Sequence, residues 1–193
     1  MMVKVEKAVR FVLPRITTYI VLSSTADRIV ETAHQYSLPT EYQLDFITRS
    51  SQHSVEQSRP DYWHTARNYL NAGHKGFCIC HRGTIAAMAW LYHNNDRILR
   101  YVTYYPLEPG HVWFHADWVN PVFRNCGLHK SLVHYRAFYV STCLGGAPVE
   151  ANIDPRNNIS LHNYETLSFI RERMLQVLSL GGRHWCSHSP LNL

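Results

Sequence analysis

A turn between a predicted strand and a predicted helix carries the residues that best fit chemistry. The segment Arg124–His129 follows an alternating strand that ends at Pro121, and an amphipathic helix begins directly after it. Such a turn leaves backbone N–H groups unpaired, and these groups bind phosphate together with the helix dipole. Gly127 can adopt positive φ, and Arg124 adds a fixed charge. The turn therefore predicts a pyrophosphate site, with an ordinary structural turn as the alternative interpretation.

The strand before this turn offers candidates for acid–base chemistry. Because alternate residues of a strand point to the same side, Trp113, His115 and Asp117 are predicted to share one face. A histidine suits a general base, because its unperturbed pKa lies near neutrality. We therefore take His115 and Asp117 as candidates for a general base or for binding of a substrate, which is the amine acceptor in the reaction that the resemblance described below implies. A buried, hydrogen-bonded histidine is the alternative.

Hydrophobic periodicity predicts the elements that position these residues. Strands are expected at residues 19–23, 76–81, 84–93, 111–120 and 149–153, and a closing hairpin at 174–180 and 183–188. Residues 24–71 are predicted to be largely helical with breaks near Pro39 and Pro60, and further helices are expected at 61–70, 128–143 and 158–169. This order predicts an α/β fold with a mixed, largely antiparallel sheet flanked by helices.

Two blocks in this order resemble the GNAT superfamily of N-acetyltransferases. The first, Val119-Asn-Pro121-Val-Phe-Arg124-Asn-Cys-Gly127-Leu-His129, is similar to the family pattern Q/R-x-x-G-x-G/A after a strand. The second, residues 157–169, is similar to N-x-x-S/A-x-x-x-Y-x-x-x-G-F. His129 stands where Gly or Ala is usual, and Ser168 stands where Gly is usual. The resemblance covers residues 82–193 and implies the GNAT acyl-CoA N-acyltransferase fold.

The resemblance also implies a reaction and roles for residues. Acetyl-CoA, or another acyl-CoA, would be the co-substrate, and its acyl group would pass directly to a primary amine in a ternary complex. The backbone at Trp118 and Val119 would pair with the pantetheine arm, and Tyr164 would donate a proton to the departing thiolate. A packed tyrosine with a tethered hydroxyl is the alternative for Tyr164. The other cofactor-binding residues would be Arg124, Asn125, Cys126, Gly127, Leu128, His129, Lys130, Asn157 and Ser160.

Length and composition favour one domain over residues 1–193. Of the 193 residues, 46% are hydrophobic and 17% are charged, as in ordinary globular proteins. Residues 19–75 would form the first strand and the acceptor-side helices, and residues 76–193 the acyl-CoA core and closing hairpin. Five scattered cysteines argue against a secreted disulfide framework, and no ligand spacing predicts a metal. Without a signal peptide or a long apolar run, a cytoplasmic protein with no membrane association is expected.

The charge of the chain and one further segment bear on the identity of its partner. A net charge of +5 favours an anionic partner, but the basic residues are spread along the chain, so nucleic acid is a minor alternative. Residues 101–110 resemble GNAT members associated with amino sugars, so an amino sugar or another small amine is the expected acceptor. An acyl-CoA-binding or regulatory module without turnover is a further alternative, as is a tRNA or protein acceptor. A homodimer is compatible with the sequence.

Overall fold

A computed structural model describes residues 14–33, 35–36, 38–93, 107–181 and 183–191. Within these residues, eight strands form one sheet in the order β2-β3-β4-β5-β6-β1-β7-β8. The strands are β1 (Arg15–Thr25), β2 (Tyr42–Ile47), β3 (Lys75–His81), β4 (Thr84–His93), β5 (Val112–Val119), β6 (Pro148–Ile153), β7 (Ile170–Leu180) and β8 (Arg183–Pro190). Pairing is parallel between β5 and β6 and antiparallel between the other neighbours, which confirms the predicted sheet.

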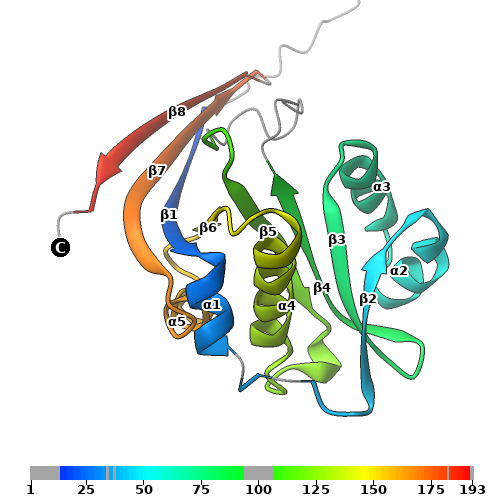
Figure 1. Cartoon of the computed structure of the whole chain (residues 1–193). Coiled ribbons are helices and arrows are strands. Elements are labelled where there is room, and N and C mark those ends of the chain that lie inside the picture. Colours follow the sequence, from blue (N-terminus) through cyan, green and yellow to red (C-terminus); the bar gives the residue numbers. More distant parts are fainter. Residues whose placement is uncertain (1–13, 34, 37, 94–106, 182, 192–193) are drawn as a thin grey trace, which may run out of the picture.

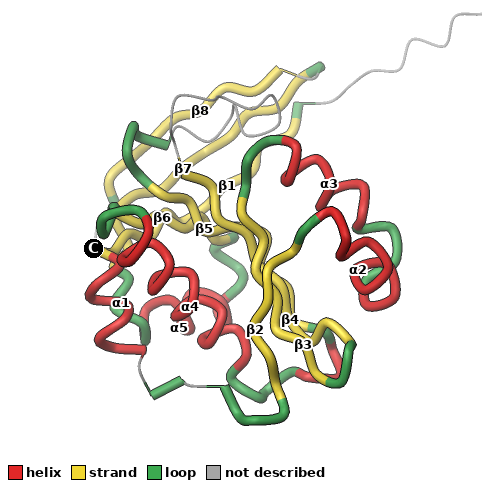
Figure 2. Tube along the Cα trace, turned by 45° about the vertical axis from the view of Figure 1, so that its right-hand side comes forward, coloured by secondary structure: helices red, strands yellow, loops and turns green. Residues whose placement is uncertain are grey.

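Helices cover both faces of this sheet (Figures 1 and 2). The helices are α1 (Ala26–Ala33), α2 (Gln52–Ser58), α3 (Trp63–Asn71), α4 (Leu128–Cys143) and α5 (Asn158–Glu165), with short 3-10 turns η1 (Arg49–Ser51) and η2 (Pro121–Phe123). Figure 2 shows α1, α4 and α5 on one side of the sheet and α2 and α3 on the other. Each layer has its own core, with Leu132 and Phe114 in one and Trp90 and Ile47 in the other. Burial of these apolar side chains holds both layers on the sheet.

The prediction that residues 24–71 are largely helical is wrong for one segment. Residues 42–47 form β2, an edge strand that pairs with β3 in the register Phe46↔Phe77. Tyr42, Leu44 and Phe46 alternate with Gln43 and Asp45, which is the period-two pattern of a strand, and the prediction of helix overlooked it. Only Ile47 is buried, and β2 is an edge strand that pairs with β3.

The first strand of the chain stabilises the end of the second family block. β1 lies between β6 and β7, so it borders the segment where α5 turns into β7. Ser168 has φ +65°, and the N–H of Phe169 donates to the Tyr164 carbonyl, which closes α5 in a Schellman arrangement. Ser24 donates a hydrogen bond to the Ser168 carbonyl oxygen at 2.8 Å. The side-chain hydroxyls of Thr32, on α1, and Ser168 form a second hydrogen bond at 2.6 Å. These bonds support a serine where glycine is usual.

The remaining elements occur at the predicted places, although β1 and β7 each begin about four residues earlier than predicted. The predicted helix at 158–169 ends at Glu165, and the closing hairpin is formed by β7 and β8. Gly182 of the hairpin turn lies outside the described residues. Residues 101–106, which carry most of the resemblance to amino-sugar GNAT members, also lie outside them.

Candidate active site

One cavity of about 470 Å³ brings the two sequence blocks together. Its walls come from the end of β5, the turn before α4 and the start of α5. The predicted cofactor-binding residues that line it are Trp118, Val119, Arg124, Asn125, Gly127, Leu128, His129, Lys130, Asn157 and Ser160. Cys126 does not line it, and its thiol lies 3.6 Å from the Arg124 carbonyl oxygen. Phe123, Ile159 and Asn163 also line the cavity, and they lie within the two blocks at positions that the family patterns leave open.

The turn at the entrance to α4 has the backbone of an anion site. Asn125 and Gly127 adopt φ +65° and +73°, and Gly127 is the N-cap residue of α4. No side chain caps this end, so the first N–H groups of α4 remain available to an anionic ligand. A Cβ at Gly127 would meet no atom within 4 Å, so positive φ is the reason for glycine.

Two of the lining side chains already have partners within the protein. The side-chain oxygen of Asn157 accepts a hydrogen bond from the Ser160 N–H at 3.1 Å and so caps α5. The ammonium of Lys130 donates to the Tyr36 hydroxyl at 3.2 Å, which turns it along the cavity wall. The exposed guanidinium of Arg124 has no partner among the described contacts, so it is the cation most accessible to a phosphate.

β5 diverges from its parallel neighbour before it reaches the cavity. Its pairing with β6 runs from Val112↔Val149 to Phe114↔Ala151 and then stops. Trp118 and Val119 still pair with β4 on the other side. Their backbone edge toward β6 therefore has no strand partner in the described structure, and an extended ligand could add to it as a strand would.

A β-bulge separates the two residues that the sequence placed on one face. Ala116 adopts φ +53°, and the β4–β5 register shifts between Met88 and Trp90. The extra residue reverses the alternation, so His115 contacts His74 on the α3 side while Asp117 contacts Arg136 of α4. The prediction of a shared face for His115 and Asp117 is therefore wrong, because it assumed a regular strand.

Asp117 lines the cavity and is the centre of a buried charged cluster. Its Oδ2 accepts hydrogen bonds from Arg136 and from the Tyr164 hydroxyl, each at 2.7 Å. Nε2 of His129 lies 3.0 Å from the same oxygen, within ion-pair distance, although no ring N–H is aligned with it as a hydrogen bond. Burial alone would raise the pKa of Asp117, but the guanidinium and the imidazole hold it well below its usual range.

Arg136 completes this cluster and was missed from the sequence. Its guanidinium is fully buried, donates to the Trp90 carbonyl at 3.0 Å and lies 4.3 Å from the Phe114 ring centroid. Burial by itself would lower the pKa of Arg136, but Asp117 raises it. The signal that was overlooked is helical spacing, because Arg136 follows Leu128 and Leu132 at intervals of four residues on the buried face of α4. A charge on that face would cost free energy without a partner, so the spacing indicates a buried ion pair.

Comparison with known proteins agrees with this arrangement. The acetyltransferase (GNAT) family matches residues 38–169, a range that contains the cavity walls and the charged cluster. The chain belongs to the GNAT acetyltransferase family. No curated protein matches it in sequence.

Solved structures show the same fold at low identity. A GCN5-related N-acetyltransferase-like protein from Streptococcus suis has a TM-score of 0.56 at 15% identity, over 86% of this chain and 62% of that one. A tandem GNAT protein from the clavulanic acid biosynthesis pathway has a TM-score of 0.61 at 13% identity, over 92% and 55%. The aminoglycoside N-acetyltransferase AAC(6')-Iy, complexed with a CoA bisubstrate analogue, gives 0.52 at 20%, over 68% and 92%. The chain thus spans less than two thirds of the first two proteins.

In this GNAT protein, His115 lies outside the cavity lining. Its Nε2 is 2.8 Å from Nδ1 of His74, and its ring stacks on Trp113 with centroids 4.3 Å apart. Burial, and then the nearby His74, lower the pKa of His115, and burial lowers the pKa of His74 to about 4. Both rings are therefore neutral at pH 7 and belong to an aromatic core.

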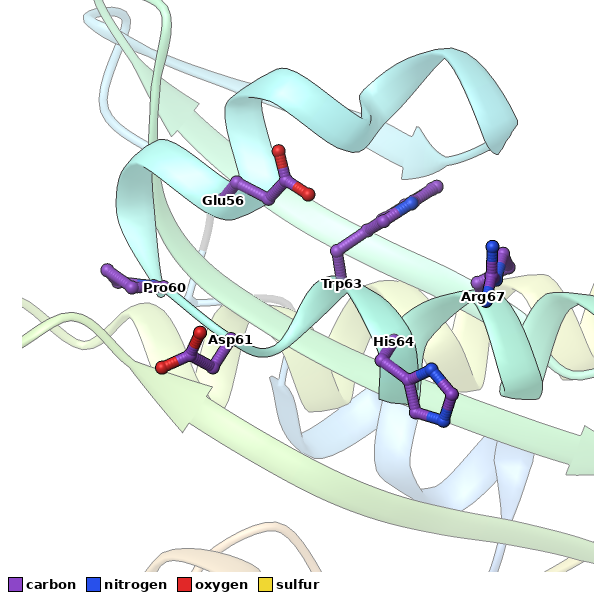
Figure 3. Close-up of a pocket in the computed structure, with 6 residues that line it drawn as sticks. All are labelled: Glu56, Pro60, Asp61, Trp63, His64 and Arg67. Atoms are coloured by element: carbon purple, nitrogen blue, oxygen red, sulfur yellow. The ribbon is translucent and has the colours of Figure 1, made fainter.

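A second concavity of about 480 Å³ lies at α2 and α3 (Figure 3). It is lined by Glu56, Pro60, Asp61, Trp63, His64 and Arg67. Figure 3 shows the carboxylates of Glu56 and Asp61 at the end near Pro60. The guanidinium of the neighbouring Arg59 lies 5.6 Å from the ring centroid of Trp118, which lines the first cavity.

Two other kinds of site have no support in the described part of the chain. Those residues include no group of three or more His, Cys, Asp or Glu side chains arranged to hold a metal ion. None of their helices is long and apolar enough to cross a membrane.

Proposed function

We propose that this protein is an acyl-CoA-dependent N-acyltransferase that moves an acetyl group from acetyl-CoA to a primary amine. The observation that carries the proposal is one cavity that joins the uncapped start of α4 to the unpaired edge of β5. An anionic pyrophosphate fits the N–H groups and Arg124, and an extended pantetheine arm fits the edge at Trp118 and Val119. Both halves of one cofactor thus have a complementary surface.

Direct transfer accounts for the acidic and basic groups near the deep end of the cavity. The amine nitrogen attacks the thioester carbonyl carbon, the C–N bond forms, and the C–S bond then breaks. The nitrogen must lose a proton and the thiolate must gain one. The family resemblance assigns the second proton to Tyr164, and this requires its hydroxyl to release Asp117. His115 is an alternative base only if a chain of bonds crosses the sheet to reach the cavity.

An amine acceptor is supported by the surface at α2 and α3. A protonated amine is attracted to carboxylates, and Glu56 and Asp61 are both exposed at the second concavity. An amino sugar or another small amine therefore remains the proposed acceptor, approaching past Arg59 and Trp118 toward the thioester.

Calorimetry with acetyl-CoA and a thiol-release assay test this function together. The acceptor panel should contain amino sugars, simple alkyl amines and a lysine-containing peptide. We expect acetyl-CoA binding and amine-dependent release of CoA. Binding without release from any acceptor would favour the non-catalytic module, and absence of binding would reject the proposal.

A pair of glycine variants separates the cofactor site from general backbone strain. We call residues 124–127, before α4, the anion turn. Gly127→Ala forces a side chain into φ +73° in this turn, and Gly83→Ala does the same at φ +81° in the β3–β4 hairpin. Both should lose roughly 1 kcal/mol of stability, since left-handed backbone disfavours a Cβ. Only Gly127→Ala should also weaken acetyl-CoA binding. Equal affinities for the two variants would remove the anion turn from the cofactor site.

A further inference from the structure

His129 lines the cavity, as does Asp117 of the same charged cluster. His129 is the second residue of α4, and its side chain is 16% exposed. Nε2 lies 3.0 Å from the Asp117 carboxylate, whereas Nδ1 is buried and has no hydrogen-bond partner among the described residues. A buried polar atom usually has a partner, so a ligand in the cavity is the natural source of one for Nδ1.

Tyr164 lies behind this residue. Its side chain is 1% exposed and does not line the cavity, and its hydroxyl already donates to Asp117 at 2.7 Å. The His129 ring packs edge-on against it, with centroids 5.4 Å apart. Burial, followed by the charge of Asp117, raises the pKa of Tyr164 above its usual range. The hydroxyl is therefore held in the protein interior, while the imidazole borders the cavity.

The two ends of the cavity differ in their exposure to solvent. Arg124 and Asn125 are exposed at the pyrophosphate end, whereas Asp117 and His129 are mostly buried. A diphosphate favours the solvated end, because burial of its charge would cost free energy. The thioester, at the opposite end of the cofactor, would then lie at the protected end beside His129.

We propose that His129 carries the proton from the acceptor amine to the departing CoA thiolate. This inference rests on the proposed acyl transfer and names the residue that handles its proton. As the C–N bond forms, the nitrogen's proton passes to the imidazole. As the C–S bond breaks, its electron pair stays on sulfur, and the imidazolium gives the proton to that sulfur. The ring ends neutral, and the products are the amide and the CoA thiol.

Asp117 and Tyr164 are then positioning residues. The carboxylate, fixed by Arg136 and by the Tyr164 hydroxyl, orients the His129 ring and stabilises the imidazolium that forms during transfer. Oδ1 of Asp117 is buried without a hydrogen-bond partner among the described residues. It can therefore accept a hydrogen bond from a donor group of a ligand in the cavity. The unusual histidine in the family pattern thus lies where a proton donor is needed.

Kinetics of three variants provide the first test. His129→Ala should lower kcat by about 100-fold or more, the contribution typical of general acid–base catalysis, with acetyl-CoA affinity within about threefold of the parent. Tyr164→Phe should lower kcat less, by about tenfold. His162→Ala is the control, because His162 is exposed on α5 and outside the cavity lining; its kcat should not change. A larger loss for Tyr164→Phe than for His129→Ala would overturn the assignment.

The pH profile of kcat adds a readout that a packing role would not change. The charged and titratable groups that face His129 are Asp117 of β5, Arg136 of the same helix and Tyr164 of α5. The lowered pKa of Asp117 and the raised pKa values of Arg136 and Tyr164 keep these three from titrating near neutrality. A kcat transition near neutrality that is lost in His129→Ala supports His129. An identical transition in both proteins overturns it.

Nitrogen NMR of the parent protein removes any dependence on variant folding or on the acceptor. With histidine labelled in the ring, the His129 signals are those lost in His129→Ala. Addition of CoA places a thiol at the deep end, so the His129 signals should shift while those of His115 should not. Saturated CoA binding without a His129 shift would reject this inference alone. Failure of the parent to bind CoA would reject the proposed function, and this inference with it.

Discussion

His115 and His129 are both largely buried histidines next to β5, and each lies within 3.0 Å of another ionisable side chain. His115 faces another histidine among aromatic rings on the α3 side. His129 faces a carboxylate that is fixed by a buried arginine on the α4 side, and it borders a cavity. The environment of His115 keeps the rings of His115 and His74 neutral. The environment of His129 combines a charged partner with access to a ligand.

The difference shows that a buried histidine next to a polar partner is not sufficient evidence for catalysis. Burial without a charge partner disfavours the imidazolium and makes the ring a packing element. A carboxylate beside the ring can stabilise the charge that the ring would gain. The bulge at Ala116 creates this contrast, because it directs His115 and Asp117 to opposite faces of one strand.

The largest expected effect concerns the charged cluster around Asp117. Arg136→Met should destabilise the protein by about 3–5 kcal/mol, because it leaves the Asp117 carboxylate buried without its main cation. Urea denaturation measures the loss. The double variant Arg136→Met with Asp117→Asn should recover part of it, since no unpaired charge remains. Strict additivity of the two substitutions would contradict the proposed pairing.

The neutral pair His74 and His115 should make the stability of the protein depend on pH. The folded pKa of His74 is about 4, below the unfolded value of about 6.5, so the unfolded state binds more protons between these values. The free energy of unfolding should therefore rise as pH increases through this window, by an amount on the order of 3 kcal/mol. Asp117, with its lowered pKa, loses its contribution only below about pH 4.

Urea denaturation between pH 4.5 and pH 7 tests the assignment to the histidine pair. His74→Phe keeps an aromatic ring that can stack on Tyr69, as His74 does with centroids 5.0 Å apart. This variant should flatten the pH dependence in the window. An unchanged slope would mean that other groups produce it.

The bulge itself predicts a smaller effect with opposite signs for two substitutions. At φ +53°, Ala116→Gly should stabilise the protein by up to about 1 kcal/mol, since glycine adopts positive φ readily. Ala116→Val should destabilise it by about 1–2 kcal/mol, because a β-branched side chain is disfavoured there. Thermal unfolding measures both changes. Equal stability of the two variants would argue against a left-handed residue between His115 and Asp117.

The smallest expected effect lies at the exposed end of the cavity. Arg124→Ala should raise the KM for the acyl donor about fivefold, or about 1 kcal/mol, with kcat unchanged, because an exposed charge contributes modestly to binding. Arg28→Ala, an exposed arginine on α1, is the matched control and should have no effect. An unchanged KM in Arg124→Ala would remove this residue from the pyrophosphate site.

Local sequence was informative wherever the chemistry is local. The positive φ of Gly127, the start of α4 at Leu128 and the hairpin of β7 and β8 all depend on neighbouring residues. At β2 the prediction of helix was wrong, although Tyr42, Leu44 and Phe46 alternate with polar residues as in a strand. The role of Tyr164 also stays a prediction, because its hydroxyl acts through partners on β5 and α4.

By itself, the sequence determined the fold class and the position of the turn before α4, because turn residues and periodicity encode them over short spans, and the resemblance of two motif blocks indicated the family. The tertiary structure decided which ionisable groups meet. Asp117, His129, Arg136 and Tyr164 come from three elements, and a shift of one residue in the register between β4 and β5 places Asp117 among them. Register and buried ion pairing are properties of contacts distant in sequence, which no local pattern specifies.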